Sequence, residues 1–244
     1  MRERVAVITG GARGIGRALA LSLAEQGWSI AICYRASHQA AQETMATLAD
    51  MGLKGIAEQC DVSRPKAAAR FAAKVEKAWG RIDALLNCAG PYHRVGLLEE
   101  TVEGWQEMFD NNLHPVFYMS RAVAPGMKQR GWGRIVNFGM ATADQLTAQP
   151  NITAHYIAKS GVLVLTRSLA RVLASSGITV NAISPGFIDS GSTPKSELQS
   201  MVKNIPAGYV GGVSDVVATV NFLLSDQARY VTGANIHLSG GWGI

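Results

Sequence analysis

Short apolar runs alternate with longer segments of helical periodicity along the whole chain, and this alternation restricts the fold more than any other feature. The apolar runs cover residues 5–9, 29–33, 55–60, 84–87, 134–138, 179–183 and 235–238. The helical segments lie between them, near residues 15–26, 38–51, 65–78, 104–130, 153–175 and 214–225. Buried strands that are separated by helices are typical of a parallel sheet covered on both faces. The sequence therefore predicts a Rossmann-type, doubly wound α/β domain with a seven-stranded parallel sheet and helices on both faces.

Turn signals indicate where these helices end and how the chain is organised. Several helical segments are followed by a glycine that can close the last turn in the left-handed conformation, namely Gly27, Gly52, Gly80 and Gly177. No linker, repeat or low-complexity stretch interrupts the chain, so we predict one domain over residues 1–244. We expect residues 1–90 to form its cofactor-binding half. The long insertion at residues 187–212, which Gly and Pro interrupt, predicts a lid over a substrate.

The composition excludes several classes of protein. Hydrophobic residues make up 48% of the chain and charged residues 17%, which excludes a disordered chain. The formal net charge is +5, but no run of five like charges occurs, so we expect no nucleic-acid partner. The apolar run after Arg4 is too short for a signal peptide or a membrane span, and we expect a cytoplasmic protein that does not contact a membrane. The widely spaced Cys33, Cys60 and Cys88 form no metal-binding motif, so we expect reduced thiols and no metal.

A glycine cluster lies directly after the first apolar run and opens the first helical segment. It reads Thr9-Gly10-Gly11-Ala12-Arg13-Gly14-Ile15-Gly16. Glycines at 10, 14 and 16 permit a tight turn and a close approach of the backbone to a phosphate group. The free N–H groups at the start of a helix attract such an anion. Because ligands of doubly wound sheets lie beyond the carboxyl ends of the strands, the cluster predicts a phosphate-binding loop.

The spacing of these glycines, with further landmarks in order, resembles the short-chain dehydrogenase/reductase family over nearly the whole chain. The landmarks are Asp61-Val62, Asn87-Cys88-Ala89-Gly90, Asn112, the Tyr156/Lys159 segment, Pro185-Gly186 and Tyr230-Val231-Thr232-Gly233. The resemblance implies an enzyme that transfers hydride between a nicotinamide dinucleotide and a carbonyl group. It also implies the positions that hold the cofactor, which are Gly10, Arg13, Gly14, Ile15, Gly16, Arg35, Asp61, Val62, Asn87, Ala89, Gly90, Lys159, Pro185, Gly186, Ile188 and Ser190.

The residues after the second apolar run indicate which dinucleotide binds. An acidic residue there would bond a ribose 2′-hydroxyl group and repel a 2′-phosphate. The run ends instead in Cys33-Tyr34-Arg35-Ala36-Ser37, without a carboxylate. Arg35 and Arg13 can both face a 2′-phosphate, as similar residues do in NADP-dependent members of the family. We therefore predict NADP(H) as the cofactor.

The family's catalytic positions match this chain only in part. Its members carry a Tyr-x-x-x-Lys sequence, in which the lysine lowers the pKa of the tyrosine that protonates the substrate. Here Tyr156 stands three residues before Lys159, and His155 occupies the fourth place. Tyr156 would reach the nicotinamide if the first turn of its helix were shifted or wound as a 3₁₀ helix. We predict Tyr156 as the acid, with Lys159 beside it and Asn112 in the proton relay, for which the neighbouring Asn111 is the alternative. The alternatives are His155 and no competent acid.

The family's substrate-binding serine is missing. Its position falls on Met140 when counted from the strand and on Ala143 when counted back from Tyr156, and neither side chain can donate a hydrogen bond. Thr142 and Asp144 are the polar residues nearby. The segment after Asp144 resembles pteridine reductases, in which an aspartate replaces this serine. Thr142, Asp144 or no residue at all therefore remain as replacements.

The resemblance is strongest to 3-oxoacyl-[acyl-carrier-protein] reductases, which dock an acidic carrier with two arginines. Arg130 matches one of these positions, and Ser176 stands at the other. We predict an NADP(H)-dependent reductase of a small-molecule ketone or aldehyde, 3-oxoacyl compounds included. The alternatives are a pteridine or quinone reductase that uses Asp144, and a catalytically weak dinucleotide-binding protein that acts as a sensor or assembly partner. The resemblance also implies a homo-oligomer, a tetramer or a dimer, through the helices at 104–130 and 153–175.

Overall fold

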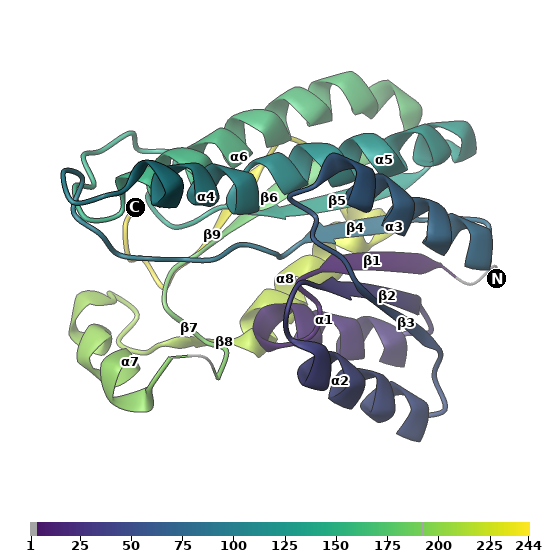
Figure 1. Ribbon diagram of the computed structural model, residues 1–244, viewed down its shortest axis with the longest axis horizontal. Coiled ribbons are helices and arrows are strands. Elements are labelled where there is room, and N and C mark those ends of the chain that lie inside the picture. Colours follow the sequence, from purple (N-terminus) through teal and green to yellow (C-terminus); the bar gives the residue numbers. More distant parts are fainter. Residues whose placement is uncertain (1–3, 192) are drawn as a thin grey trace.

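Seven parallel strands form one sheet at the centre of the computed structural model, which describes residues 4–191 and 193–244 (Figure 1). In spatial order the strands are β3 (Gly55–Gln59), β2 (Ser29–Tyr34), β1 (Val5–Thr9), β4 (Ala84–Asn87), β5 (Gly133–Phe138), β6 (Ile178–Pro185) and β9 (Asn235–Leu238). The order reverses between β1 and β4, which are neighbours in the sheet. Ligands of doubly wound sheets bind at such a reversal point. The predicted parallel sheet is confirmed, and the reversal indicates where a site lies.

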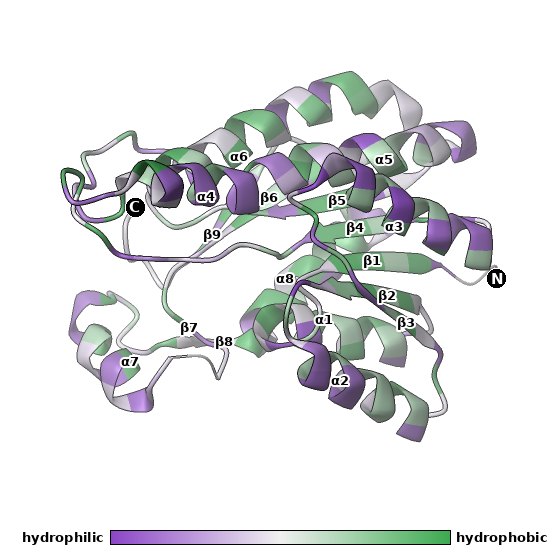
Figure 2. Cartoon of the chain, in the orientation of Figure 1, coloured by the Kyte–Doolittle hydropathy of each residue, from purple (hydrophilic) through white to green (hydrophobic). Residues whose placement is uncertain are grey.

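Helices cover both faces of the sheet and bury two core clusters against it. One face carries α1 (Gly14–Glu25), α2 (His38–Asp50) and α8 (Val213–Leu224). The other face carries α3 (Pro65–Trp79), α5 (His114–Arg130) and α6 (Thr153–Leu173). Short 3₁₀ turns are η1 (Ala174–Ser176), η2 (Val202–Asn204) and η3 (Asp226–Ala228). Figure 2 shows that hydrophobic residues concentrate in the strands between the two helical layers. None of the described helices is long and apolar enough to cross a membrane.

The single helix predicted over residues 104–130 is wrong, because two helices occupy this region: α4 (Val102–Asn112) and α5 (His114–Arg130). Pro115 is the physical reason. Proline has no N–H group to donate to the carbonyl four residues before it, and its ring crowds that carbonyl. Leu113 therefore separates the two helices. The break leaves Asn112 at the carboxyl end of α4, where it is buried.

The predicted helix ends agree with the structure, whereas some strands are longer than predicted. The glycines that follow helices have φ between 72° and 82°, the left-handed region that favours glycine, at Gly27, Gly52, Gly80 and Gly177. The strand expected over residues 179–183 extends through Pro185. It does so because Ser184 and Pro185 pair with His237 and Leu238 of β9. This extension places Pro185 at the edge of the sheet where the strands end.

The segment at residues 187–212 leaves the sheet after β6 and returns to it at α8. It contains β7 (Ile188–Asp189), α7 (Lys195–Met201) and β8 (Gly211–Gly212), and Ser192 lies outside the described residues. β7 and β8 pair in parallel and close the base of the segment. The C-terminal tail contacts it, since the Ala207 N–H group donates to the Gly240 carbonyl at 2.9 Å. The rings of Phe187 and Trp242 lie 4.7 Å apart.

A buried carboxylate joins the start of β1 to the start of β4. Asp83 is fully buried and accepts hydrogen bonds from the Val5 N–H group at 2.9 Å and from Arg81 at 2.7 Å. Replacing Asp83 with alanine leaves the Val5 N–H group buried without a partner. We therefore expect Asp83→Ala to lower the free energy of unfolding by about 3 kcal/mol, measured by urea unfolding.

An exposed ion pair provides the control for Asp83→Ala. Lys74 pairs with Glu58, and both side chains reach solvent. We expect Lys74→Ala to change the free energy of unfolding by less than about 1 kcal/mol. Equal losses in the two variants would show that the Asp83 contacts add nothing beyond a surface pair.

Candidate active site

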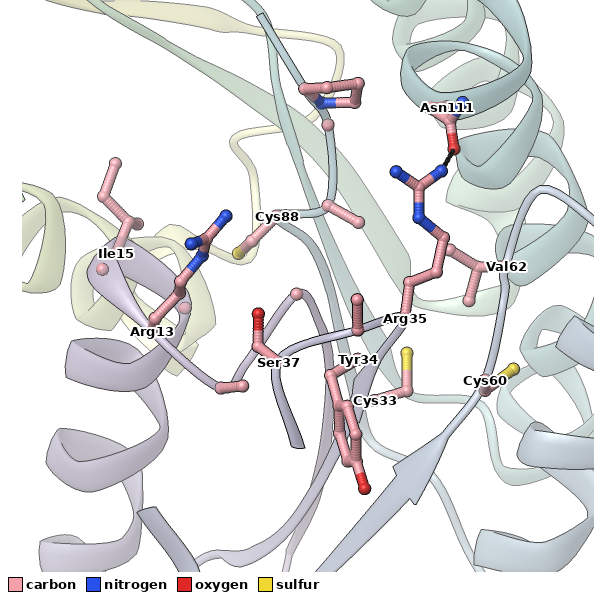
Figure 3. Close-up of a pocket in the computed structure, with 18 of the residues that line it drawn as sticks. Arg13, Ile15, Cys33, Tyr34, Arg35, Ser37, Cys60, Val62, Cys88 and Asn111 are labelled. Carbon is pink, nitrogen blue, oxygen red and sulfur yellow. Dashed lines mark hydrogen bonds between the residues drawn. The ribbon is translucent and has the colours of Figure 1, made fainter. Parts of the chain in front are cut away.

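A cavity of about 430 Å³ opens at the carboxyl ends of β1 to β4, beside the reversal point of the sheet (Figure 3). The predicted cofactor residues that line it are Gly10, Arg13, Gly14, Ile15, Gly16, Arg35, Asp61, Val62, Ala89, Gly90 and Ser190. Lining residues that the sequence analysis did not assign to the cofactor are Ala12, Cys33, Tyr34, Ala36, Ser37, Cys60, Cys88, Pro91 and Asn111. Most of these additional lining residues adjoin strand ends. The rule that ligands bind beyond the carboxyl ends of the strands could therefore have found them. It could not have found Asn111, because this residue comes from α4.

The glycine loop after β1 forms the floor of this cavity. Gly10 and Gly14 have φ of 66° and 55°, which favours glycine. A Cβ atom on Gly16 would lie 2.4 Å from the Gly10 carbonyl oxygen, and one on Gly10 would lie 3.1 Å from the Ala89 Cα atom. The Ala89 N–H group also donates to Thr9 Oγ1 at 3.1 Å. The loop is therefore closed against the end of β4, and it leaves the amino end of α1 facing the cavity.

Two arginines flank the cavity on opposite sides (Figure 3). Arg13 precedes α1, and Arg35 follows β2. Arg35 donates a hydrogen bond to Asn111 Oδ1 at 2.9 Å, and its guanidinium group lies 3.9 Å from Glu107. Ser37 stands at the amino end of α2, where its side chain makes no capping bond. These groups together form a site that suits an anion.

The end of β3 contributes a polar and an apolar side chain to the cavity. Asp61 Oδ1 accepts from the Ser63 N–H group at 3.0 Å, and its other oxygen lies 3.9 Å from Arg64. Val62 is buried beside it. The turn at Ser63 thus orients the carboxylate at the rim.

Lys159 and Asn112 lie behind Gly90, near the carboxyl ends of β4 and β5 and outside the residues that line the cavity. Lys159 is buried, and its ammonium group donates to the Phe138 carbonyl at 2.9 Å. Burial lowers the pKa of Lys159 from 10.5 to about 8. A Cβ atom on Gly90 would lie 2.5 Å from Asn112 Oδ1 and 3.4 Å from Lys159 Nζ. Asn112 Nδ2 donates to the Pro91 carbonyl at 3.1 Å, whereas Oδ1 is buried without a partner.

Besides Lys159, four predicted cofactor positions lie outside the lining of this cavity. Asn87 ends β4 and donates to Asn137 Oδ1 at 2.8 Å, which ties β4 to β5. Pro185 ends β6, and the Gly186 N–H group donates to the Leu238 carbonyl at 3.0 Å. Ile188 begins β7. These four residues follow the strands that continue the sheet beyond β4, so they extend the same edge toward the lid segment.

The first turn of α6 is regular α-helix rather than 3₁₀ helix. The Tyr156 N–H group donates to the Ile152 carbonyl at 2.8 Å, which is the α-helical spacing. The 3₁₀ winding that would turn Tyr156 toward the nicotinamide is therefore not present at this residue. The Tyr156 hydroxyl group donates to the Thr142 carbonyl at 2.8 Å and accepts from the Thr147 N–H group at 3.0 Å. His155 is also buried, and its Nδ1 atom has no partner.

The loop after β5 presents no obvious replacement for the missing serine. Thr142 is mostly buried, and its hydroxyl oxygen has no hydrogen-bond partner. Asp144 Oδ2 accepts from Asn235 at 3.0 Å and lies 2.8 Å from His237 Nε2. Partial burial acts to raise the pKa of Asp144, but hydrogen bonds from His237 and Asn235 outweigh it and lower that pKa. The Asp144 carboxylate is therefore bound to side chains of β9. Met140, which stands at the serine position when counted from the strand, follows the end of β5 and cannot donate a hydrogen bond from its side chain.

The residues in and behind the lining of the cavity fit a nicotinamide dinucleotide. Its glycine floor leaves room for phosphate groups where a Cβ atom would clash. Two arginines flank it, and the unpartnered Asn112 oxygen and the Lys159 ammonium group lie behind its lining residue Gly90. Within the described residues, no three His, Cys, Asp or Glu side chains gather as metal ligands.

Residues 10–243 match a protein-family model described as enoyl-(acyl carrier protein) reductase. Among curated proteins, the chain is 36% identical to the 3-oxoacyl-[acyl-carrier-protein] reductase FabG of Staphylococcus aureus, over 97% of this chain and 96% of the relative. It is 34% identical to the FabG of Haemophilus influenzae, over 99% of this chain and 98% of the relative.

Two solved structures are similar to this chain in both fold and sequence. A candidate short-chain alcohol dehydrogenase from Sinorhizobium meliloti superposes with a TM-score of 0.91 at 31% identity, and covers 99% of this chain and 97% of its own. A candidate gluconate dehydrogenase from Agrobacterium tumefaciens gives a TM-score of 0.90 at 31% identity, with 98% and 95% covered. With the glycine loop, the sheet order and these full-length matches in agreement, the chain belongs to the short-chain dehydrogenase/reductase family of oxidoreductases.

Proposed function

We propose that the protein is an NADPH-dependent reductase of carbonyl compounds, with 3-oxoacyl compounds as its substrate class. The observation that carries the proposal is the anion site in the cavity together with the buried Lys159, which lies behind Gly90 in the lining of the same cavity. An anionic cofactor would span the two. When bound, NADPH would supply the hydride that reduces the carbonyl carbon.

The two arginines support NADPH over NADH. Arg35 and Arg13 would pair with the 2′-phosphate, and the end of β2 offers no carboxylate that would repel it. Ser37 and the amino end of α2 would add hydrogen-bond donors to the same group.

Lys159 and Asn112 would manage the protons of the reaction. An ammonium group with a pKa near 8 is a proton source matched to neutral pH. The buried Asn112 oxygen, which has no protein partner, would hold a water molecule that connects Lys159 to solvent. The side chain that meets the substrate oxygen comes from the first turn of α6. The family resemblance assigns this role to Tyr156, and His155 is the alternative.

The names of the relatives support the substrate class. Both FabG relatives are named as 3-oxoacyl-[acyl-carrier-protein] reductases. Arg130, which matches a carrier-docking arginine, donates to the Ile82 carbonyl of its own chain. We therefore propose that the acyl group, rather than the carrier, is what this protein recognises, with residues 187–212 as the lid. Exposed Ile157, Val164 and Val172 on α6 support a homo-oligomer.

A cofactor titration followed by turnover on the same sample tests this function. We expect NADPH to bind at least about tenfold more tightly than NADH, measured by fluorescence, because the 2′-phosphate adds contacts to cationic groups. We also expect NADPH oxidation with β-ketoesters, followed by absorbance. Tight NADPH binding without turnover on β-ketoesters, diketones, quinones or pterins would instead favour a binding protein. The occupied Tyr156 hydroxyl group is the observation that favours this second candidate.

A further inference from the structure

Two adjacent side chains at the start of α6 have different surroundings, and this difference assigns them different roles. We infer that His155 donates a hydrogen bond to the carbonyl oxygen of the substrate, and that Tyr156 instead positions the loop at residues 141–147. The inference rests on the proposed reductase function, because it names the residue that contacts the substrate in that reaction.

The helix geometry places His155 and Lys159 on one face. The first turn of α6 has α-helical hydrogen bonds, so residues four apart lie above one another. Tyr156 is rotated by about 100° from His155 around the axis. A regular helix therefore sends the two side chains in different directions.

His155 lies close to residues of the predicted catalytic part of the site. Its ring lies 5.1 Å from that of Tyr92 in an edge-on arrangement, and both the Pro91 carbonyl and the charge of Lys159 affect its pKa. Pro91 lines the cavity, and its carbonyl oxygen also accepts from Asn112. His155 is 7% exposed, and Nδ1 is buried without a partner. A buried polar atom without a partner is costly, which points to a ligand that completes it.

The Tyr156 hydroxyl group has no proton left to donate to a substrate in this arrangement. It donates to the Thr142 carbonyl and accepts from the Thr147 N–H group, both in the loop after β5. This loop is strained, because Thr142 has φ of 74° and Leu146 has φ of 53°, values that non-glycine residues rarely adopt. Ser160 of α6 also holds it, by donating to the Ala143 carbonyl. Tyr156 thus stabilises a backbone conformation that would otherwise relax.

The His155 ring is neutral at physiological pH. Burial and, after it, the positive charge of Lys159 lower its pKa to about 3, although the Pro91 carbonyl favours the charged form. His93 acts in the same direction as Lys159. A neutral imidazole can still polarise a carbonyl group through its N–H bond.

The proton on the product follows from this arrangement. The neutral His155 ring has one N–H group, and this role requires the proton to be on Nδ1, the nitrogen without a protein partner. As the substrate oxygen becomes negative, it takes this proton. The ring then recovers a proton from the Lys159 ammonium group, and Lys159 recovers one from water. Lys159 is therefore the proton source, and His155 is the residue that contacts the substrate oxygen.

Paired substitutions test the exchange of roles. We expect His155→Phe to lower turnover with ethyl acetoacetate about 100-fold, because the ring remains but its N–H group is lost. His155→Asn, which keeps a neutral donor close to the position of Nδ1, should stay within about tenfold of the wild type. Tyr156→Phe should lower turnover less than about tenfold, but it should lower the melting temperature by about 5 °C, since the buried Thr142 carbonyl and the partly buried Thr147 N–H group lose a partner.

A spectroscopic measurement separates contact from structure. Ethyl acetoacetate labelled with ¹³C at the keto carbon would be bound with NADP⁺, which cannot reduce it. The ¹³C resonance should move downfield in the wild type, in His155→Asn and in Tyr156→Phe, because a hydrogen bond polarises the carbonyl group. It should stay at its solution value in His155→Phe. All variants should bind NADPH as the wild type does.

The outcomes that overturn the inference are distinct from a failure of the proposed function. If Tyr156→Phe loses turnover about 100-fold at an unchanged melting temperature and His155→Phe stays active, then Tyr156 is the contact residue. If the wild type binds NADPH but reduces no carbonyl compound, the proposed function fails and the inference fails with it.

Discussion

Replacing Lys159 with methionine should lower turnover about 1000-fold and raise the melting temperature of the cofactor-free protein by about 6 °C. The loss follows because methionine keeps the length of the side chain but has no proton to give. The gain follows because Lys159 is buried with its charge, and the hydrogen bond that its ammonium group makes is to a neutral acceptor, the Phe138 carbonyl. In the proposed reaction, Lys159 would thus serve turnover at the expense of the stability of the fold.

The sign of the stability change comes from the pKa of Lys159. Burial lowers this pKa from 10.5 to about 8, so the unfolded chain keeps the proton to a higher pH than the folded protein does. The folded state is thus penalised at every pH below about 8, and the penalty is relieved as pH rises toward 10.5. The shift corresponds to about 3 kcal/mol. Loss of the hydrogen bond to Phe138 offsets about 1 kcal/mol, which leaves a net gain of about 2 kcal/mol.

Urea unfolding of the cofactor-free protein at pH 7 and at pH 9.5 measures this effect. The wild type should gain about 2 kcal/mol relative to Lys159→Met between these two pH values, because only the wild type loses the buried proton. Lys128→Met, at an exposed lysine in the last turn of α5, is the matched control and should leave both stability and turnover unchanged. A Lys159→Met protein that is less stable than the wild type at pH 7 would contradict the desolvation argument.

The parts of the fold that the sequence predicts well are those that depend on local pattern. β1 was predicted at its observed bounds, because five buried residues precede a glycine loop. The floor of the cavity was predictable for the same reason, since Gly16 stands where any Cβ atom would meet the Gly10 carbonyl. Chain-local steric rules are sufficient in both cases. The break in the helix at Leu113 also has a local cause, Pro115. It was not predicted, because the apolar periodicity continues across it.

The parts that the sequence does not predict depend on contacts between distant segments. Asn111 meets Arg35 only because α4 lies against the end of β2, and no spacing rule relates the two residues. The Tyr156 hydroxyl group is occupied by the loop after β5, whose course depends on Asp144 contacting His237 of β9. A motif places a residue on a helix, but the partner that receives its polar atom is decided by packing. That is why the cofactor end of the site was easier to derive than the catalytic end.

Replacing Arg35 with aspartate should reverse the cofactor preference, with a loss of about 1000-fold in NADPH affinity and little loss for NADH. The variant removes a cation that faces the predicted 2′-phosphate and puts a carboxylate beside that phosphate. Placing two negative charges next to each other costs several kcal/mol of binding free energy. The same carboxylate could accept hydrogen bonds from the 2′-hydroxyl group of NADH. Because the Arg35 side chain is 55% exposed, the fold should tolerate the change.

Fluorescence titration of both cofactors at low and high salt measures this preference. NADPH affinity of the wild type should fall with ionic strength more steeply than that of Arg35→Asp, since screening weakens the pairing with the phosphate. Arg171→Asp, which makes the same change of charge at an exposed position of α6, is the matched control and should preserve the preference for NADPH. If both variants lose NADPH affinity equally, the general positive charge of the protein attracts the cofactor and Arg35 does not select it. If Arg35→Asp alone reverses the preference, the residue after β2 decides which dinucleotide this reductase uses.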